Sequence, residues 1–207
     1  MTLNPIQPNR RTQAERRAES EHRLLHAAAE IVVSVGLTAA TFENVGRRAG
    51  YSRGLAAQKF GSKQGLVEAL VAHLESRQAG LWPSDPNMPG LESILGYVDA
   101  FLRNLGHDGE ARAYFMLMSG AVSDLSPHRT DFAQVHERVE RRLESLVKRG
   151  QDEGNISSGL DADAMALMIG ALLLGVSMQV LVNPSIDINP IRMTSLAALR
   201  QALVSRP

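Results

Sequence analysis

The stretch TFENVGRRAGYSRGLAAQKF, residues 41–60, decides the fold of this chain. It predicts a helix capped by Thr41, a tight turn at Gly50, and a short second helix capped by Ser52. Two short helices joined by such a turn are typical of a helix-turn-helix, whose second helix enters the major groove of DNA. The stretch therefore predicts a nucleic-acid-binding head.

Helices on either side complete the predicted head. Thr12 begins a capping-box pattern, and the apolar residues after it recur at helical spacing. Ser62 is placed to cap a further helix. We therefore expect a three-helix helix-turn-helix domain over residues 12–62, preceded by a disordered arm at residues 1–11.

The exposed face of the second short helix has the residue types that DNA contact requires, while Leu55 and Phe60 are expected to anchor it inward. Arg53 can read guanine or hold a phosphate, and Gln58 can read adenine. The neighbouring polar and basic residues are expected to contact phosphates. The complete set of expected DNA-binding residues is Thr41, Arg47, Ser52, Arg53, Gln58, Lys59 and Lys63. The alternative is a basic surface helix that only keeps the protein soluble.

Charge is distributed unevenly, although the formal net charge is zero. Residues 1–63 contain ten Lys/Arg and five Asp/Glu, whereas residues 64–207 contain twelve and seventeen. A basic head on an acidic body suits a protein that meets phosphate at one end only, a chance fluctuation being the alternative.

The composition excludes several kinds of site. The chain has no cysteine, which excludes disulfides, thiolate metal sites and a cysteine nucleophile. Because no glycine-rich phosphate loop, HExxH or GxSxG motif occurs, we expect neither an enzyme nor a cofactor. His107, His128 and His136 are too scattered for a metal site and are expected at the surface or at helix ends. The N-terminal segment has no apolar run, so we expect a cytoplasmic protein.

The rest of the chain predicts an all-α body. The proline-rich segment LWPSDPNMPG, residues 81–90, is expected to be a loop. Ser126-Pro127 and Asn189-Pro190 each place a capping residue before a first-turn proline. No alternating strand pattern and no internal repeat is found. The expected helices lie near residues 91–106, 109–122, 127–153, 161–182 and 190–204.

Residues 164–182, AMALMIGALLLGVSMQVLV, are apolar on nearly every side. Their length raises the alternative of a membrane span, but Ser177 and Gln179 interrupt the run and no positive cluster flanks it. In a soluble protein such a helix must be covered on two faces. We expect one face to meet the chain's own core and the other a partner chain, a purely internal core helix being the alternative.

The residues of the head, in order, resemble the N-terminal domain of the tetracycline-repressor (TetR) family of bacterial regulators. The resemblance covers Leu24–Leu70 and rests on Ala28-Ala29, Gly36, Thr41, Ala49-Gly50-Tyr51-Ser52, Gly54, Phe60, Ser62-Lys63 and Leu66. The chain has Val45-Gly46 where the family usually has Ile-Ala. It also lacks the recognition-helix tyrosine that precedes His-Phe, so that tyrosine's phosphate contact is not carried over to Ala57 or Gln58.

The resemblance implies a homodimeric, sequence-specific DNA-binding transcriptional regulator: a repressor that a small, apolar ligand releases from a palindromic operator. It places effector binding and dimerisation in residues 63–207, with the dimer formed through about 161–182 and 190–204. Methionines and aromatics suit an adaptable pocket, and plain core packing is the alternative. The candidate pocket residues are Phe101, Phe115, Met116, Met165 and Met168. The alternative function is a DNA-architectural or interaction protein with little sequence specificity.

Overall fold

The computed structural model describes residues 12–123 and 128–204. In this part of the chain the secondary structure is nine α-helices and one 3-10 helix without a strand, which confirms the all-α prediction. The arm expected at residues 1–11 and the cap expected at Ser126 lie outside the described residues. The chain forms two compact units that divide between Leu70 and Val71, inside one helix.

The first unit holds α1 (Gln13–Val35), the 3-10 helix η1 (Leu37–Ala39), α2 (Phe42–Ala49), α3 (Arg53–Phe60) and the start of α4 (Lys63–Ala79). The predicted capping box is present: Glu15 N donates to Thr12 Oγ1 at 3.2 Å, and Thr12 N donates to Glu15 Oε2 at 2.8 Å. One face of α1, including Leu24, Ala28 and Val32, is buried. The predicted core of the head is therefore present.

The turn between α2 and α3 contains Gly50, and it also explains Gly46, the glycine that departs from the family pattern. Gly50 has a φ of 77°, a left-handed conformation that glycine adopts without strain. Gly46 is buried, and a Cβ there would lie 3.0 Å from the carbonyl oxygens of Tyr51 and Ser52. The absent side chain lets α2 approach the turn closely, which offsets the poor helix propensity of glycine.

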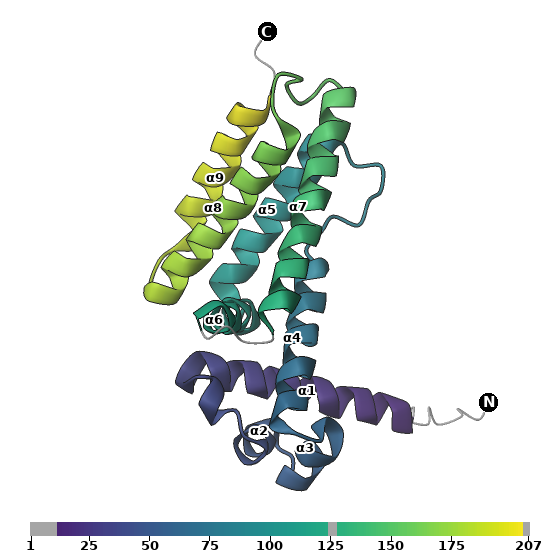
Figure 1. Ribbon diagram of the computed structural model, residues 1–207, viewed down its shortest axis with the longest axis vertical. Helices are drawn as coiled ribbons and strands as arrows, with labels where there is room; N and C mark the ends of the chain where they lie inside the picture. The colour runs from purple at the N-terminus through teal and green to yellow at the C-terminus, as the bar shows by residue number, and fades with distance from the viewer. Residues whose placement is uncertain (1–11, 124–127, 205–207) are drawn as a thin grey trace, which may run out of the picture. The chain divides into compact units, whose positions relative to one another are not determined.

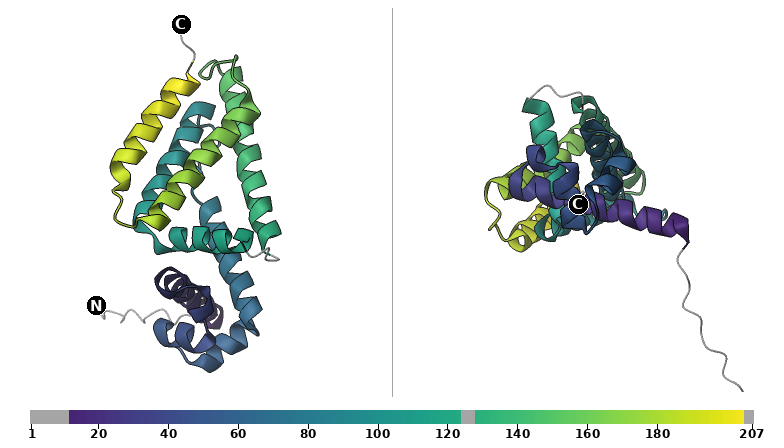
Figure 2. Two further views of the ribbon diagram at one scale, coloured as in Figure 1. Left: turned by 60° about the vertical axis from the view of Figure 1, so that its left-hand side comes forward. Right: turned by 90° about the horizontal axis from the view of Figure 1, so that it is seen from below.

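The second unit is a helical bundle. It contains the end of α4, then α5 (Gly90–His107), α6 (Gly109–Ser123), α7 (Arg129–Asp152), α8 (Ala162–Val182) and α9 (Ile188–Leu203). Figure 1 shows α5, α7, α8 and α9 side by side, and Figure 2 shows α6 lying across one end of them. α5 contacts α6, α7, α8 and α9, so it forms the centre of the bundle.

Gly90 lets α5 approach α7 closely, and Gly150 makes room on α7 for the segment that follows it. A Cβ at Gly90 would lie 2.4 Å from the carbonyl oxygen of Leu146 and 2.6 Å from the nitrogen of Gly150. A Cβ at Gly150 would lie 2.4 Å from Ile156 Cδ1. Because the first of these contacts is with backbone, no side-chain adjustment can make room for it.

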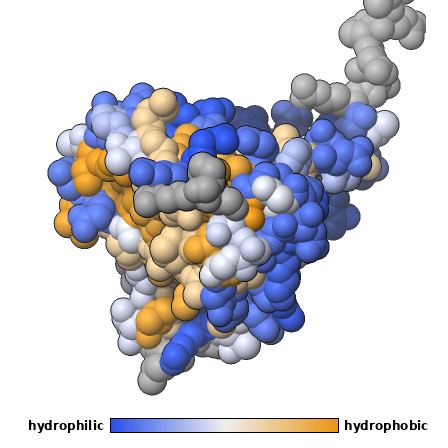
Figure 3. All heavy atoms as spheres, turned by 90° about the horizontal axis from the view of Figure 1, so that it is seen from above, coloured by the Kyte–Doolittle hydropathy of each residue, from blue (hydrophilic) through white to orange (hydrophobic). Residues whose placement is uncertain are grey.

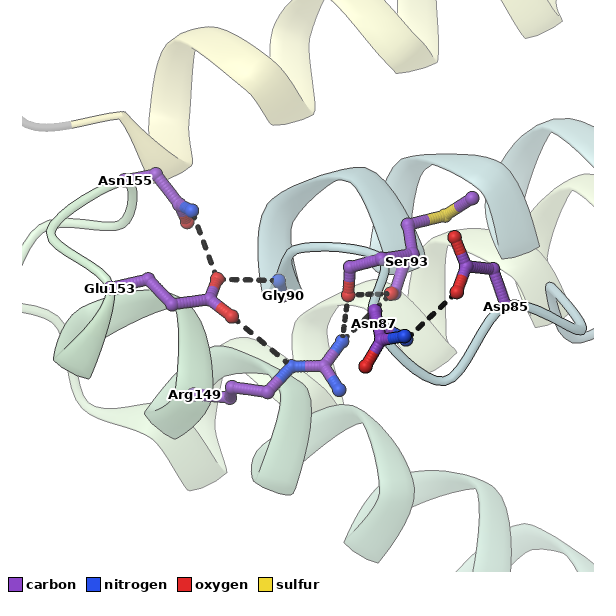
Figure 4. A network of polar contacts seen from close by, with 8 residues as sticks. Asp85, Asn87, Gly90, Ser93, Arg149, Glu153 and Asn155 are labelled. Carbon is purple, nitrogen blue, oxygen red and sulfur yellow. Dashed lines mark hydrogen bonds and ion pairs between the residues drawn. The ribbon is translucent and has the colours of Figure 1, made fainter.

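The loop before α5 is fastened to the end of α7 (Figure 4). Arg149 donates to the carbonyl oxygen of Met88 and, at 2.9 Å, to Ser93 Oγ. Glu153 accepts hydrogen bonds from Gly90 N at 2.8 Å and from Asn155 at 3.0 Å. These donors hold the pKa of Glu153 below its ordinary value, the Gly90 amide being the largest cause. The loop predicted at residues 81–90 is therefore held at its C-terminal end.

Two long-range ion pairs join α9 to α5. Asp99 on α5 pairs with Arg192 on α9, and Glu92 pairs with Arg200 at 3.0 Å. The start of α9 differs from the prediction: Asp187 caps it, accepting from Asn189 N at 3.0 Å. Asn189 is therefore inside the helix, because the aspartate two residues earlier provides the capping oxygen.

Helix α8 packs against α5, α6 and α7 in the bundle. By length and composition alone it is also apolar enough to cross a membrane, with a mean hydropathy of 2.2 in its most apolar window. Its composition is only weak evidence for a membrane span, since the core helix of a helical bundle has the same composition. Asp161 caps α8 by accepting from Ala164 N at 3.0 Å.

Candidate functional site

The second helix of the motif is short and docked through a small residue. Ser52 Oγ accepts from Leu55 N at 3.1 Å and so begins α3. Ala56 is fully buried, whereas Leu55 and Phe60 are only half-buried. The prediction that these two larger residues anchor the helix inward is therefore only partly right. The small Ala56 is the residue of α3 that is buried, and α3 contacts α2.

Two of the expected DNA-binding residues are exposed on α3. Arg53 and Gln58 are exposed, and neither has a hydrogen bond or ion pair with another described residue. Both side chains keep their full hydrogen-bonding capacity for an external partner. The structure thus places a guanidinium and a carboxamide on the outer face of one helix.

Thr41 caps the start of α2, and Arg47 lies in its last turn. The Thr41 hydroxyl accepts from Asn44 N at 3.2 Å, and Arg47 Nη2 donates to Asn44 Oδ1 at 2.8 Å. Both residues are exposed. Both contacts are made with Asn44, so the positions of Thr41 and Arg47 are set by α2 itself, at its start and in its last turn respectively.

The two expected lysines are engaged within the first unit. Lys59 Nζ donates to the carbonyl oxygen of Arg17 at 2.8 Å and lies 3.4 Å from Glu21 Oε2, and only 7% of its side chain is exposed. Lys63 Nζ donates to the carbonyl oxygen of Thr38 at 3.0 Å. These contacts tie α3 to α1 and α4 to η1.

Arginines of α1 lie beside α3, and the sequence reasoning missed them. Arg16 and Arg17 line a polar groove of about 490 Å³ together with Gln58 and Lys59. Arg23 lies over the ring of Tyr51, 5.3 Å from its centroid. The available signal was the excess of positive charge in the N-terminal third of the chain, which includes these arginines.

A cavity lies within the second unit. About 50 Å³ of it is open to the centres of water-sized molecules, and aromatic and apolar residues dominate its walls. Of the candidate pocket residues, Phe101 and Phe115 line it, with ring centroids 5.8 Å apart. Met116 and Met165 are not among the lining residues, and Met168 lies elsewhere. The lining residues are Gln78, Tyr97, Phe101, Tyr114, Phe115, Val135, His136, Val139, Gly170, Leu173 and Leu174.

The titratable groups of this cavity are held neutral by their surroundings. Burial raises the pKa of Tyr97 and of Tyr114 far above the ordinary value for tyrosine. Burial of the imidazole lowers the pKa of His136, while Glu140 acts in the opposite sense. His136 keeps an exposed edge, and its Nε2 lies 3.0 Å from Met118 Sδ. It is thus a residue of the cavity wall as well as of the surface.

A second apolar depression lies on the outside of the bundle. It is a groove of about 600 Å³ whose walls include Met168, Leu172, Ile191 and Leu199, from α8 and α9. Leu167 is 60% exposed and Val182 is 83% exposed. Viewed from above, apolar patches lie among polar residues on the surface of the bundle (Figure 3). Within the described residues no group of three or more His, Cys, Asp or Glu could hold a metal ion.

Comparison with known proteins agrees with this geometry. Residues 24–70 match the model for bacterial regulatory proteins of the tetR family, and residues 97–204 match the C-terminal domain of BetI-type transcriptional repressors. The chain is 24% identical over 167 residues to the HTH-type transcriptional regulator SrpR of Pseudomonas putida, covering 80% of this chain and 76% of that protein.

Solved structures share the fold. A TetR transcriptional regulator from Chloroflexus aurantiacus is 20% identical, with a TM-score of 0.74 over 91% of this chain and 98% of that one. SmeT, the repressor of the Stenotrophomonas maltophilia multidrug efflux pump SmeDEF, is 23% identical, with a TM-score of 0.71 over 89% and 90%. Since family models match both the head and most of the body, the chain belongs to the TetR family of bacterial regulators, DNA-binding transcriptional regulators that are typically repressors and are not enzymes.

Proposed function

We propose that this chain is a cytoplasmic, homodimeric repressor that binds a palindromic operator and leaves it when a small ligand enters the cavity of the body. Residues 12–62 would be the DNA-binding domain and residues 63–207 the effector-binding and dimerisation domain. The observation that carries the proposal is the outer face of α3, where Arg53 and Gln58 are exposed and uncommitted.

The contacts divide into those that read bases and those that hold the backbone. Arg53 and Gln58 are assigned to base edges, because their forked donors and acceptors can pair with guanine and adenine. Thr41, Arg47 and Ser52 are assigned to phosphates near helix termini. Lys63 and Lys59 would contribute by exchanging their internal carbonyl partners for phosphate oxygens.

Dimerisation is assigned to α8 and α9. The exposed residues of α8 recur at three- and four-residue spacing, and among them Ala171 and Gly175 leave room for close approach. The apolar groove beside them supplies surface for a partner to bury. A two-fold dimer would place two recognition helices on half-sites one DNA turn apart. Gly175→Arg should convert the dimer to a monomer, as measured by sedimentation. Gln134→Arg, at an exposed position of α7, is the control and should leave the dimer intact.

Release by ligand is assigned to the cavity that Phe101 and Phe115 line. Its volume is smaller than a drug-sized molecule requires, so a bound effector must move the surrounding helices or side chains. An effector that binds the widened form better shifts the population toward it. In the proposed dimer that form would hold its two heads at a spacing that no longer fits the operator.

The test is selection of bound fragments from a random duplex pool with the purified chain at one stated salt concentration. Enrichment of a palindrome supports a dimeric, sequence-reading repressor. Binding without enrichment would favour the architectural alternative, and absence of binding at low salt would refute both. Repeating the selection with Arg53→Ala should change the enriched sequence, whereas Arg141→Ala on α7 should not.

A further inference from the structure

The cavity of the second unit contains an unpaired polar atom. Gln78, at the end of α4, lines the cavity, and its Oε1 is buried without a hydrogen-bond partner among the described residues. A buried amide oxygen without a partner is unfavourable, and such atoms in folded proteins call for an explanation. A ligand that supplies the missing partner would relieve that cost.

The walls of the cavity favour an uncharged molecule. No Asp, Glu, Lys or Arg lines it, and its aromatic rings meet edge to face, as between Phe101 and Phe115 and between Tyr114 and Phe115. Burial keeps the pKa of Tyr97 and Tyr114 high and that of His136 low, so all three stay neutral near pH 7. A charged ligand would lose its hydration there without gaining a counter-ion.

The ring that would best attract a cation is already occupied. Trp82 stacks on Tyr97 with ring centroids 3.7 Å apart, and the guanidinium of Arg142 lies 4.3 Å from the Trp82 centroid. With a ring on one face and a cation on the other, Trp82 has no free face for a ligand cation. This arrangement disfavours quaternary ammonium compounds despite the many aromatic residues.

We propose that the effector is a neutral aromatic compound carrying a hydroxyl group, with the ring against the wall formed by Phe101 and Phe115 and the hydroxyl paired to the Gln78 carboxamide. This inference rests on the proposed function of the cavity and names its ligand class. A hydroxyl both donates and accepts, so it satisfies the carboxamide whichever way its oxygen and nitrogen are oriented. Gly170 supplies the space, because a Cβ there would meet nothing within 4 Å.

The experiment measures binding of four probes to the DNA-free protein by titration calorimetry: phenol, toluene, benzoate and phenyltrimethylammonium. Phenol should bind about tenfold more tightly than toluene, because one satisfied hydrogen bond is worth about that factor. In a purely apolar cavity the order would reverse, since an unpaired hydroxyl is costly to bury. The two charged probes should bind at least about tenfold more weakly than phenol.

Variants assign the effect to particular residues. Gln78→Met should remove the preference for phenol over toluene while toluene still binds, and Gln134→Met, on the exposed face of α7, should leave the preference unchanged. Gly170→Leu should abolish binding of both and the milder Gly170→Ala should weaken it, whereas Gly120→Leu, also in open space, should not.

Four results would overturn the inference: equal or tighter binding of toluene, tighter binding of a charged probe, an unchanged preference in Gln78→Met, or no binding of any probe. None of these bears on whether the chain selects a palindrome, so the proposed DNA-binding function would stand or fall separately.

Discussion

The contacts within each unit span different distances along the chain. In the first unit the caps join residues three positions apart, such as Thr41 with Asn44, and Lys59 reaches Arg17, 42 positions away. In the second unit Asp99 reaches Arg192, 93 positions away, and Glu92 reaches Arg200, 108 positions away. A change in the head should therefore disturb helices that are close in the sequence, whereas a change in the body should disturb helices far away in the sequence. The following predictions test that difference, beginning with the largest expected effect.

Gly90→Ala should lower the free energy of unfolding of the body by about 3 kcal/mol. The added Cβ would lie 2.4 Å from the carbonyl oxygen of Leu146, so α5 and α7 must separate. Thermal unfolding measures the loss, and hydrogen exchange should show faster exchange of α7 amides as well as those of α5.

Two glycine variants serve as controls for Gly90→Ala. Gly120→Ala adds a methyl group in open space on α6 and should leave stability unchanged or raise it by up to about 1 kcal/mol. At Gly65 a Cβ would lie 2.2 Å from the carbonyl oxygen of Phe60, so Gly65→Ala should speed exchange only near the start of α4 and the end of α3. If Gly65→Ala also exposed α7, the contrast between local and distant damage would be lost.

Arg53→Ala should weaken binding to the selected operator by about 2 kcal/mol, roughly 30-fold. Because Arg53 has no partner among the described residues, its loss should change the unfolding free energy by less than about 0.5 kcal/mol. Anisotropy titration of labelled operator at fixed salt measures the first quantity and thermal unfolding the second. Equal losses in both would mean that this exposed face also stabilises the head.

Ser52→Ala and Asp161→Ala remove one cap each, in the head and in the body. Each should cost about 1 kcal/mol, since each hydroxyl or carboxylate satisfies one amide at the start of its helix. Only Ser52→Ala should also weaken operator binding, by disordering the first turn of α3. An operator affinity reduced equally by Asp161→Ala would show that the two units do not respond separately.

Glu75→Gln should stabilise the body at high pH only, by less than about 1 kcal/mol, because solvent screens this partly exposed carboxylate. Burial raises the pKa of Glu75, outweighing Arg138, and its Oε1 has no partner among the described residues. The folded state therefore binds this proton more tightly than the unfolded state, and the resulting stabilisation is lost as pH rises from 4.5 through the raised pKa. Because Gln is always neutral, the free energy of unfolding of the variant should equal that of the native protein near pH 4 and exceed it near pH 8. Denaturant titrations at the two pH values measure both. Equal stability at both would refute the prediction.

The sequence predicted most of the head because its signals are short-range. Thr41, Gly50 and Ser52 act on their own turns, so spacing alone identifies their roles. It did not reveal that Lys59 donates to the carbonyl oxygen of Arg17, since that contact joins α3 to α1 across the fold. The same limit explains why Arg16 and Arg17, which line the polar groove beside α3, were not predicted as part of the site.

The cavity was less predictable. Phe101 and Phe115 were selected as aromatic residues on consecutive helices, and they do line it. Met168 was selected by composition, but its position on α8 turns it toward the outer groove. His136 was expected only as a surface or helix-end histidine, although it also lines the cavity. Which helix faces meet depends on packing between α4, α5, α6, α7 and α8, and no pattern within one helix records that.

The stack of Tyr97, Trp82 and Arg142 has a practical consequence. Trp82 is the only tryptophan of the chain, so all indole emission comes from a ring that touches a wall residue of the cavity. Any compound that displaces Tyr97 changes the environment of this single fluorophore. The unlabelled protein can therefore be screened against compound libraries by light emission alone, before its operator is known.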